Sequence, residues 1–203
     1  MRTGSIDARD RKKAQREAAL ARRGELSDEA REHAARFVRD RVMEFDMPAD
    51  AVVSGFLPIH SEIDPRPALE ALRTRGHSIV LPVIVGRRAI EFRLWSEGSR
   101  LVECGFGTYG PGPEAPVMNP EVLLVPLAVF DAAGNRIGYG AGYYDAAFAR
   151  LEKTGPVLKI GLAYAVQEAD EVPVEAHDVP LDFIVTEKGV LDIRGGREGT
   201  AIA

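Results

Sequence analysis

Three glycines at alternate positions, Gly138, Gly140 and Gly142, separate an apolar run at 122–130 from a helix-compatible segment at 143–151. Glycine lets a backbone turn through positive φ and approach a ligand closely. A loop of this kind between a strand and a helix N-terminus directs several N–H groups at one place, which suits a phosphate. The pattern predicts a strand–loop–helix unit with an anion site in its loop.

Charged residues flank this glycine loop. Arg136 places a forked guanidinium at its entrance, and Asp145 offers a carboxylate at its exit for a cation such as Mg²⁺. The spacing Gly-x-Gly-x-Gly matches neither the dinucleotide fingerprint nor a P-loop. A glycine-rich turn at a sheet edge, with Tyr143 and Tyr144 as packing residues, is therefore the alternative to a site for polyphosphate and metal.

Length and composition indicate one globular domain. The chain has 203 residues, of which 45% are hydrophobic and 28% charged. We expect a domain over 1–193 and a frayed tail over 194–203. A net charge of −5 argues against a general nucleic-acid binder, and a single cysteine excludes a disulfide framework within the chain. Without a long apolar span or a leader segment, the expected location is the cytoplasm, away from membranes.

Basic residues concentrate near the start of the chain. The segment at about 8–23 is rich in Ala, Arg, Lys and Glu and predicts a helix that ends at Gly24. Lys12 and Arg16 are four residues apart, so both side chains emerge on one side of the helix and can hold one polyphosphate. The alternative is an ordinary solvated face.

The rest of the sequence alternates apolar runs with helical patterns. We expect a helical stripe that starts after Ser27 and continues to Pro48, and a long irregular loop at 96–120. Such alternation predicts an α/β fold with a largely parallel sheet and ligands at the carboxyl ends of its strands. The expected further helices are 65–75 and 143–151, and the expected strands are 51–57, 79–85, 90–94, 122–130, 157–163 and 181–185.

Several motifs occur together in a characteristic order. They are Lys12-x-x-x-Arg16, Phe56-Leu57-Pro58, Glu62-Ile63-Asp64, Val125-Pro126, Phe130-Asp131, the stretch 134–145, Gly161-Leu162-Ala163-Tyr164, His177-Asp178 and Thr186-Glu187. With them the chain resembles the 5-formyltetrahydrofolate cyclo-ligases, or 5,10-methenyltetrahydrofolate synthetases, over roughly 9–190. The resemblance implies a three-layer α/β fold, with a mostly parallel central sheet and helices on both faces, similar to sugar-phosphate isomerases and CoA-transferase-like proteins.

The resemblance also implies an activity. Members of this family close 5-formyltetrahydrofolate to 5,10-methenyltetrahydrofolate, converting ATP to ADP and phosphate with Mg²⁺. ATP phosphorylates the formyl oxygen, and N10 of the folate then attacks the activated carbon. The nucleophiles belong to the substrates, so positioning and charge stabilisation are the tasks left to the protein. We accordingly expect a monomeric ligase whose partners are the folate and ATP, without nucleic acid or membrane.

Site residues follow from the motif positions. The resemblance gives Lys12, Arg16 and Arg136 the catalytic role of holding phosphates, and Asp145 and Asp178 the role of Mg²⁺ ligands. The implied ATP-binding set is Lys12, Lys13, Arg16, Arg136, Ile137, Gly138, Tyr139, Gly140, Ala141, Gly142, Tyr143 and Tyr144. The implied folate-binding set is Leu57, Glu62, Tyr139, Gly140, Ala141, Gly142 and Tyr143, in which the Glu62 carboxylate holds the pterin through two parallel hydrogen bonds.

The chain departs from the family pattern inside the glycine loop. Tyr139 and Ala141 occupy positions where relatives often carry a basic residue, so the phosphates would depend more on backbone N–H groups, Lys12, Arg16 and Arg136. This departure supports an alternative, a non-catalytic relative that binds folate or nucleotide. A sugar-phosphate isomerase-like enzyme is a further alternative that rests on fold analogy alone.

Overall fold

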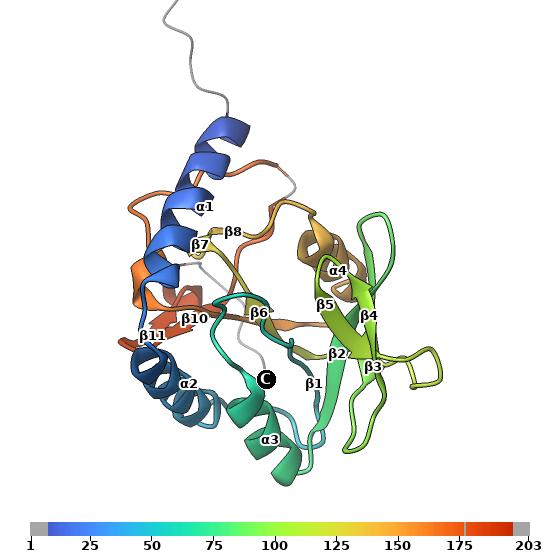
Figure 1. Ribbon diagram of the computed structural model, residues 1–203. Coiled ribbons are helices and arrows are strands. Elements are labelled where there is room, and N and C mark those ends of the chain that lie inside the picture. Colours follow the sequence, from blue (N-terminus) through green and yellow to red (C-terminus); the bar gives the residue numbers. More distant parts are fainter. Residues whose placement is uncertain (1–7, 177, 197–203) are drawn as a thin grey trace, which may run out of the picture.

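The computed structural model describes residues 8–176 and 178–196, and its centre is a seven-stranded sheet (Figure 1). The strands lie in the order β11-β10-β9-β6-β1-β2-β3. The strand bounds are β1 Val52–Ser54, β2 Ser78–Gly86, β3 Ala89–Leu94, β6 Val122–Pro126, β9 Leu158–Leu162, β10 Phe183–Thr186 and β11 Gly189–Asp192.

The inner part of the sheet is parallel and both edges are antiparallel. Strands β10, β9, β6, β1 and β2 pair in parallel, whereas β3 and β11 close the edges as hairpin partners of β2 and β10. Inner parallel strands are covered on both faces and read as continuous apolar runs. The burial of Val122, Leu123, Leu124 and Val125 in β6 follows this rule.

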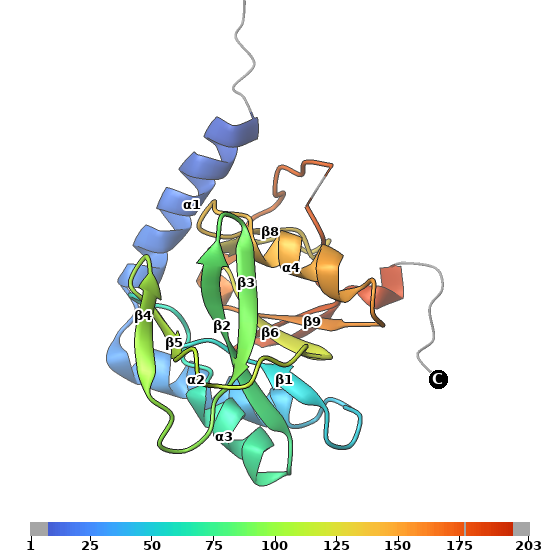
Figure 2. The same cartoon turned by 90° about the vertical axis from the view of Figure 1, so that its right-hand side faces the viewer.

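Helices cover both faces of the sheet, which confirms the predicted three-layer α/β fold (Figure 2). Helices α2 (Asp28–Val42) and α3 (Arg66–Thr74) pack on one face through apolar residues such as Val38 and Leu69. Helix α4 (Tyr143–Leu151) packs on the other face through Phe148 and Leu151. In the described part of the chain, no helix has the length and apolarity needed to cross a membrane.

Local signals account for several boundaries. The Ser27 hydroxyl accepts a hydrogen bond from the Ala30 N–H and caps α2, as predicted. The apolar stripe of this helix stops at Val42, so the expected continuation to Pro48 is wrong. The segment at 143–151 forms α4 with the predicted bounds, beginning after Gly142 in a left-handed conformation with φ of 69°.

Two small hairpins were not predicted. Strands β4 (Leu101–Gly105) and β5 (Thr108–Pro111) pair within 96–120, so the expectation of an irregular loop there is wrong. The run at 122–130 is also not one strand. It ends as β6 at Pro126, and β7 (Val129–Phe130) then turns away to pair with β8 (Arg136–Ile137). The end of the sequence forms a short 3₁₀ turn at Arg194–Gly196, and the remainder of the predicted tail lies outside the described residues.

The chain returns to one end of the sheet after each central strand. The segments 55–64, 127–142 and 163–182 follow β1, β6 and β9, and the carboxyl ends of parallel strands share one edge. Helix α1 (Ala8–Gly24) lies across this edge beside β7 and β8 (Figure 1). Its Ala19 is buried in an apolar cluster with Val129 and Ile137.

Candidate active site

Arg136 and Asp145 tie the two ends of the glycine loop together. The guanidinium of Arg136 donates from Nη2 to Oδ1 of Asp145 over 2.8 Å and from Nη1 to the carbonyl of Val179. The same guanidinium lies over the ring of Phe148, 4.9 Å from its centroid, and the side chain is only 6% exposed. Asp145 also accepts from the backbone N–H of Val179 at 3.3 Å. Arg136 therefore fixes the geometry of the loop through these contacts and also places a positive charge beside it.

Lys12 brings helix α1 to the segment that follows β9. Its ammonium donates to Oδ2 of Asp178 at 2.6 Å and to Oε2 of Glu175 at 2.8 Å. Burial acts to lower the pKa of Lys12, but the hydrogen bonds and charges of the two carboxylates outweigh it, so the pKa is raised. Lys12 is thus a cation under all physiological conditions, held here by two acids.

The predicted metal ligands Asp145 and Asp178 are linked through the backbone at Val179. Asp178 is adjacent to Val179, whose N–H reaches Asp145, so both carboxylates face the same turn. Each of them is hydrogen-bonded to a cation, Arg136 or Lys12. Among the described residues no group of three or more His, Cys, Asp or Glu could hold a metal. Two carboxylates with phosphate oxygens and water do make a suitable Mg²⁺ shell, so the oxygen donor set fits that ion.

Tyr139 connects the glycine loop to the predicted pterin acid through a buried guanidinium. The Arg23 side chain, from the last turn of α1, is 1% exposed and donates from Nη2 to the Tyr139 hydroxyl at 2.9 Å and from Nε to the Ser61 hydroxyl at 3.0 Å. The hydroxyl of Tyr139 in turn acts on Glu62 and lowers the pKa of its carboxyl. The glycine loop, α1 and the loop after β1 are therefore joined by one polar network.

Burial sets the protonation of this network. Glu62 is 8% exposed, and desolvation raises its pKa in spite of hydrogen bonds from the Ile59 N–H and Tyr139 and the positive charge of Arg23. Burial and the charge of Glu62 raise the pKa of Tyr139 to about 12, so its hydroxyl stays protonated. Glu62, the residue expected to hold the pterin, is consequently a buried carboxyl with a raised pKa rather than a solvated loop residue.

Tyr144 carries a hydroxyl with no partner. Its side chain is partly exposed, but the hydroxyl oxygen itself is enclosed and makes no hydrogen bond within the described residues. Burial, followed by the charge of Glu62, raises the pKa of this hydroxyl, while the charge of Arg136 opposes the rise. A buried hydroxyl without a partner in the described protein is uncommon in native structures.

One predicted residue faces solvent, another packs partly against the core, and one helix residue was missed. Lys13 is 65% exposed and lies 4.0 Å from Glu17 on the outer surface of α1. Leu57 packs partly buried against the core on the side of α2 and α3. Arg23 was overlooked, although it is eleven residues after Lys12 and so shares its helix face. His177, the first residue of the His177-Asp178 motif, lies outside the described residues.

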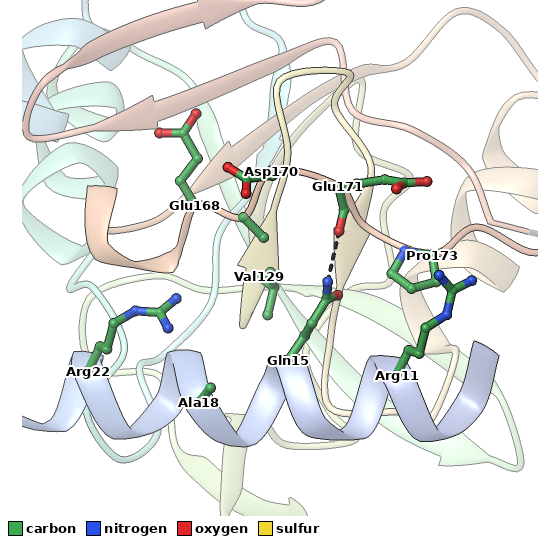
Figure 3. A pocket seen from close by; sticks show the side chains of 10 residues that line it. Arg11, Gln15, Ala18, Arg22, Val129, Glu168, Asp170, Glu171 and Pro173 are labelled. Carbon is green, nitrogen blue, oxygen red and sulfur yellow. Dashed lines mark hydrogen bonds between the residues drawn. The ribbon is translucent and has the colours of Figure 1, made fainter. Parts of the chain in front are cut away.

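A separate hollow lies along a neighbouring face of α1. It has a volume of about 470 Å³ and is bounded by Arg11, Gln15 and Arg22 on the helix and by the segment 168–173 (Figure 3). Gln15 spans it by donating to the carbonyl of Glu171 at 2.8 Å. Its walls carry charges of opposite sign, two arginines against Glu168, Asp170 and Glu171. Acidic residues in the wall would repel a polyphosphate, so the opposite charges fit contacts between helix α1 and the segment 168–173 better than a polyphosphate site.

The fold and the site define a class of α/β enzyme, with a cationic glycine-rich loop at the carboxyl edge of a parallel sheet. Comparison with known proteins gives the family. The family model described as "5-formyltetrahydrofolate cyclo-ligase family" matches residues 8–187, and the chain belongs to that family. The predicted resemblance is confirmed.

Relatives of known sequence or structure cover most of the chain. The 5-formyltetrahydrofolate cyclo-ligase of Escherichia coli K12 is 31% identical over 178 residues, 83% of this chain and 96% of the relative. That of Mycolicibacterium smegmatis is 29% identical over 70% of this chain and 77% of its own. The solved 5,10-methenyltetrahydrofolate synthetase of Aquifex aeolicus superposes with a TM-score of 0.73 at 30% identity, covering 95% of this chain and 96% of the other.

The buried state of Glu62 predicts how stability varies with pH. Because its pKa is raised above the ordinary 4.5, the native protein binds this proton more tightly than the unfolded chain does. The wild type therefore gains stability as the pH falls through the raised pKa towards 4.5. Glu62→Gln lacks this gain because its side chain does not titrate. The variant should therefore have the larger free energy of unfolding at pH 7, and its difference from the wild type should be smaller at pH 4.5.

Urea unfolding of both proteins at several pH values in this window measures the effect. Glu103→Gln, at an exposed position on β4, is the matched control and should show a stability difference that is nearly independent of pH. A margin for Glu62→Gln that widens on acidification would contradict the raised pKa.

Proposed function

We propose that this chain closes 5-formyltetrahydrofolate to 5,10-methenyltetrahydrofolate with ATP and Mg²⁺, releasing ADP and phosphate. One observation carries the proposal. Arg16 lies beside Gly140 of the glycine loop, Arg136 holds Asp145 at the exit of that loop, and the hydroxyl of Tyr139 in the same loop acts on the enclosed carboxyl of Glu62. A phosphate site and a site for a nitrogen heterocycle are thereby joined, as transfer from ATP to a pterin requires.

The reaction consists of two substitutions. The formyl oxygen attacks the γ-phosphorus and ADP leaves, which turns a poor leaving group into a phosphate ester. The lone pair of N10 then attacks the formyl carbon, phosphate departs with the former formyl oxygen, and N10 loses its proton. Both steps build or move negative charge on phosphate oxygens, so the protein's task is to hold the reactants in line and to stabilise that charge.

Lys12 has a different partner in each state under this proposal. In the structure it is held by Asp178 and Glu175, which keeps the ammonium at the edge of the site. Incoming phosphates would offer the Lys12 ammonium a stronger concentration of negative charge than Asp178 and Glu175 do. Asp178 and Asp145 are the carboxylates that would hold Mg²⁺ beside those phosphates. When bound, the ion neutralises phosphate charge and fixes the geometry of the triphosphate.

Glu62 orients the folate. Its carboxylate can accept two parallel hydrogen bonds from a pterin ring N–H and the adjacent exocyclic amine, which fixes one ring orientation. Arg23 opposes the effect of burial on Glu62 and favours the ionised carboxylate that this contact needs.

The first experiment follows the absorbance of the methenyl product formed from (6S)-5-formyltetrahydrofolate with and without ATP and Mg²⁺. Product should form only when both are present, with one ADP released for each product. Product without ATP would contradict the proposed mechanism. Tight folate binding by folded protein, with no ATP consumption, would instead establish a non-catalytic relative. Size-exclusion chromatography in the same samples checks the proposed monomer.

The pterin role of Glu62 predicts a selective defect. Glu62→Gln replaces one acceptor oxygen by an amide that presents N–H groups to the pterin donors. The KM for 5-formyltetrahydrofolate should rise about tenfold or more, as expected for the loss of a charge-assisted contact, with less than a twofold change in the KM for ATP. Glu103→Gln should alter neither constant. Equal increases in both constants would remove Glu62 from the pterin site.

The two neighbouring lysines of α1 should behave differently. Lys12→Met removes an ammonium near the phosphates and should raise the KM for ATP about tenfold. Lys153→Met, an exposed change far along the chain in the turn after α4, is the matched control and should leave it unchanged. Lys13→Met tests the nucleotide role expected for Lys13 from its motif position. An increase close to that of Lys12→Met would confirm that role, and no increase would assign Lys13 to the solvated face.

A further inference from the structure

Two guanidiniums from distant parts of the sequence lie against the glycine loop. A methyl group added at Gly140 would lie 3.5 Å from Nη1 of Arg16, which comes from α1. One added at Gly142 would lie 3.3 Å from Nε of Arg88, which comes from the turn between β2 and β3. The loop residue between these glycines, Ala141, therefore has an arginine near each of its neighbours.

Neither guanidinium has a side-chain partner among the described residues. Over 8–176 and 178–196, neither Arg16 nor Arg88 has an ion pair or a hydrogen bond from its side chain, whereas Lys12 and Arg136 are held by carboxylates. Gly142 is the N-cap of α4, where the helix dipole adds further positive potential. Arg16 and Arg88 repel each other, since the nearby carboxylate of Asp145 is engaged by Arg136, and an anion bound between the two guanidiniums would be attracted to both.

The backbone at Arg88 adds an independent argument. Its φ is 55°, in the left-handed region that glycine and asparagine adopt easily and most other residues avoid. Arginine is an unfavourable choice for such a turn on conformational grounds alone. Non-glycine residues in strained conformations concentrate at ligand sites, where the side chain compensates for the strain.

We propose that Arg88 is a phosphate-binding residue of the nucleotide site and acts together with Arg16 on the triphosphate. This inference rests on the proposed function, since it assigns a further ligand to the same ATP site. Arg88 supplies from the β2–β3 turn the side-chain charge that Tyr139 and Ala141 do not provide within the loop. A planar guanidinium can donate two hydrogen bonds to one phosphate, which suits this position better than a flexible ammonium.

The test compares Arg88→Asn with Arg87→Asn, its sequence neighbour at the same exposed turn. Asparagine tolerates positive φ, so Arg88→Asn should fold with a thermal midpoint equal to or above that of the wild type in the absence of ligand. Its KM for ATP should rise about tenfold, with the KM for 5-formyltetrahydrofolate changed less than twofold. Arg88→Lys should recover part of the loss, and Arg87→Asn should match the wild type.

Binding without turnover separates this inference from the proposed function. Calorimetric titration with ATP and with inorganic tripolyphosphate, in the absence of folate, should show weaker binding to Arg88→Asn than to Arg87→Asn. That result supports the phosphate role even if the wild type forms no methenyl product, in which case only the proposed function fails. Unchanged ATP binding and KM in Arg88→Asn would overturn the inference. An increase confined to the KM for the folate would also overturn it, and would place Arg88 at a folate carboxylate.

Discussion

The parallel pairing of β1, β6 and β9 is the constraint on which the site depends. Parallel strands end at a common edge, so the segments that follow these three strands meet there, although the strands end at residues as far apart in the sequence as Ser54, Pro126 and Leu162. The first delivers Glu62, the second the glycine loop and the third Asp178. Helix α1 lies over this edge and joins all three through Lys12 and Arg23.

Some charged side chains in the site form ion pairs within the protein, whereas another has no such partner among the described residues. Arg136 and Lys12 are paired with Asp145 and Asp178, and both pairs are largely shielded from water. Burying either partner alone would be costly, so the pairs stabilise the site while no ligand is bound. Arg16 lacks such a partner in the described chain and keeps its charge available. The combination suits the proposed nucleotide site, which would form before ATP binds and still attract a polyanion.

Local sequence predicted much of this architecture. The start of α2 at its Ser27 cap and the exact extent of α4 follow from short-range signals, because capping and helical periodicity act within a few residues. The hairpin of β4 and β5 was missed, since glycines and prolines around it obscure the alternation of a short exposed ribbon. The break of the run at 122–130 was missed because β7 turns aside only to pair with β8, a contact invisible to periodicity.

The sequence by itself determined the fold class, the family and the polar residues available, because apolar periodicity, glycine spacing and motif order are properties of the chain alone. Tertiary structure decided which of those residues meet. It turned Lys13 to solvent, drew Arg23 into the network with Tyr139 and Glu62, and brought the β2–β3 turn to Gly142. The physical reason is that direction and burial depend on packing between distant segments, whereas helix phase fixes only the relative orientation of residues on the same helix.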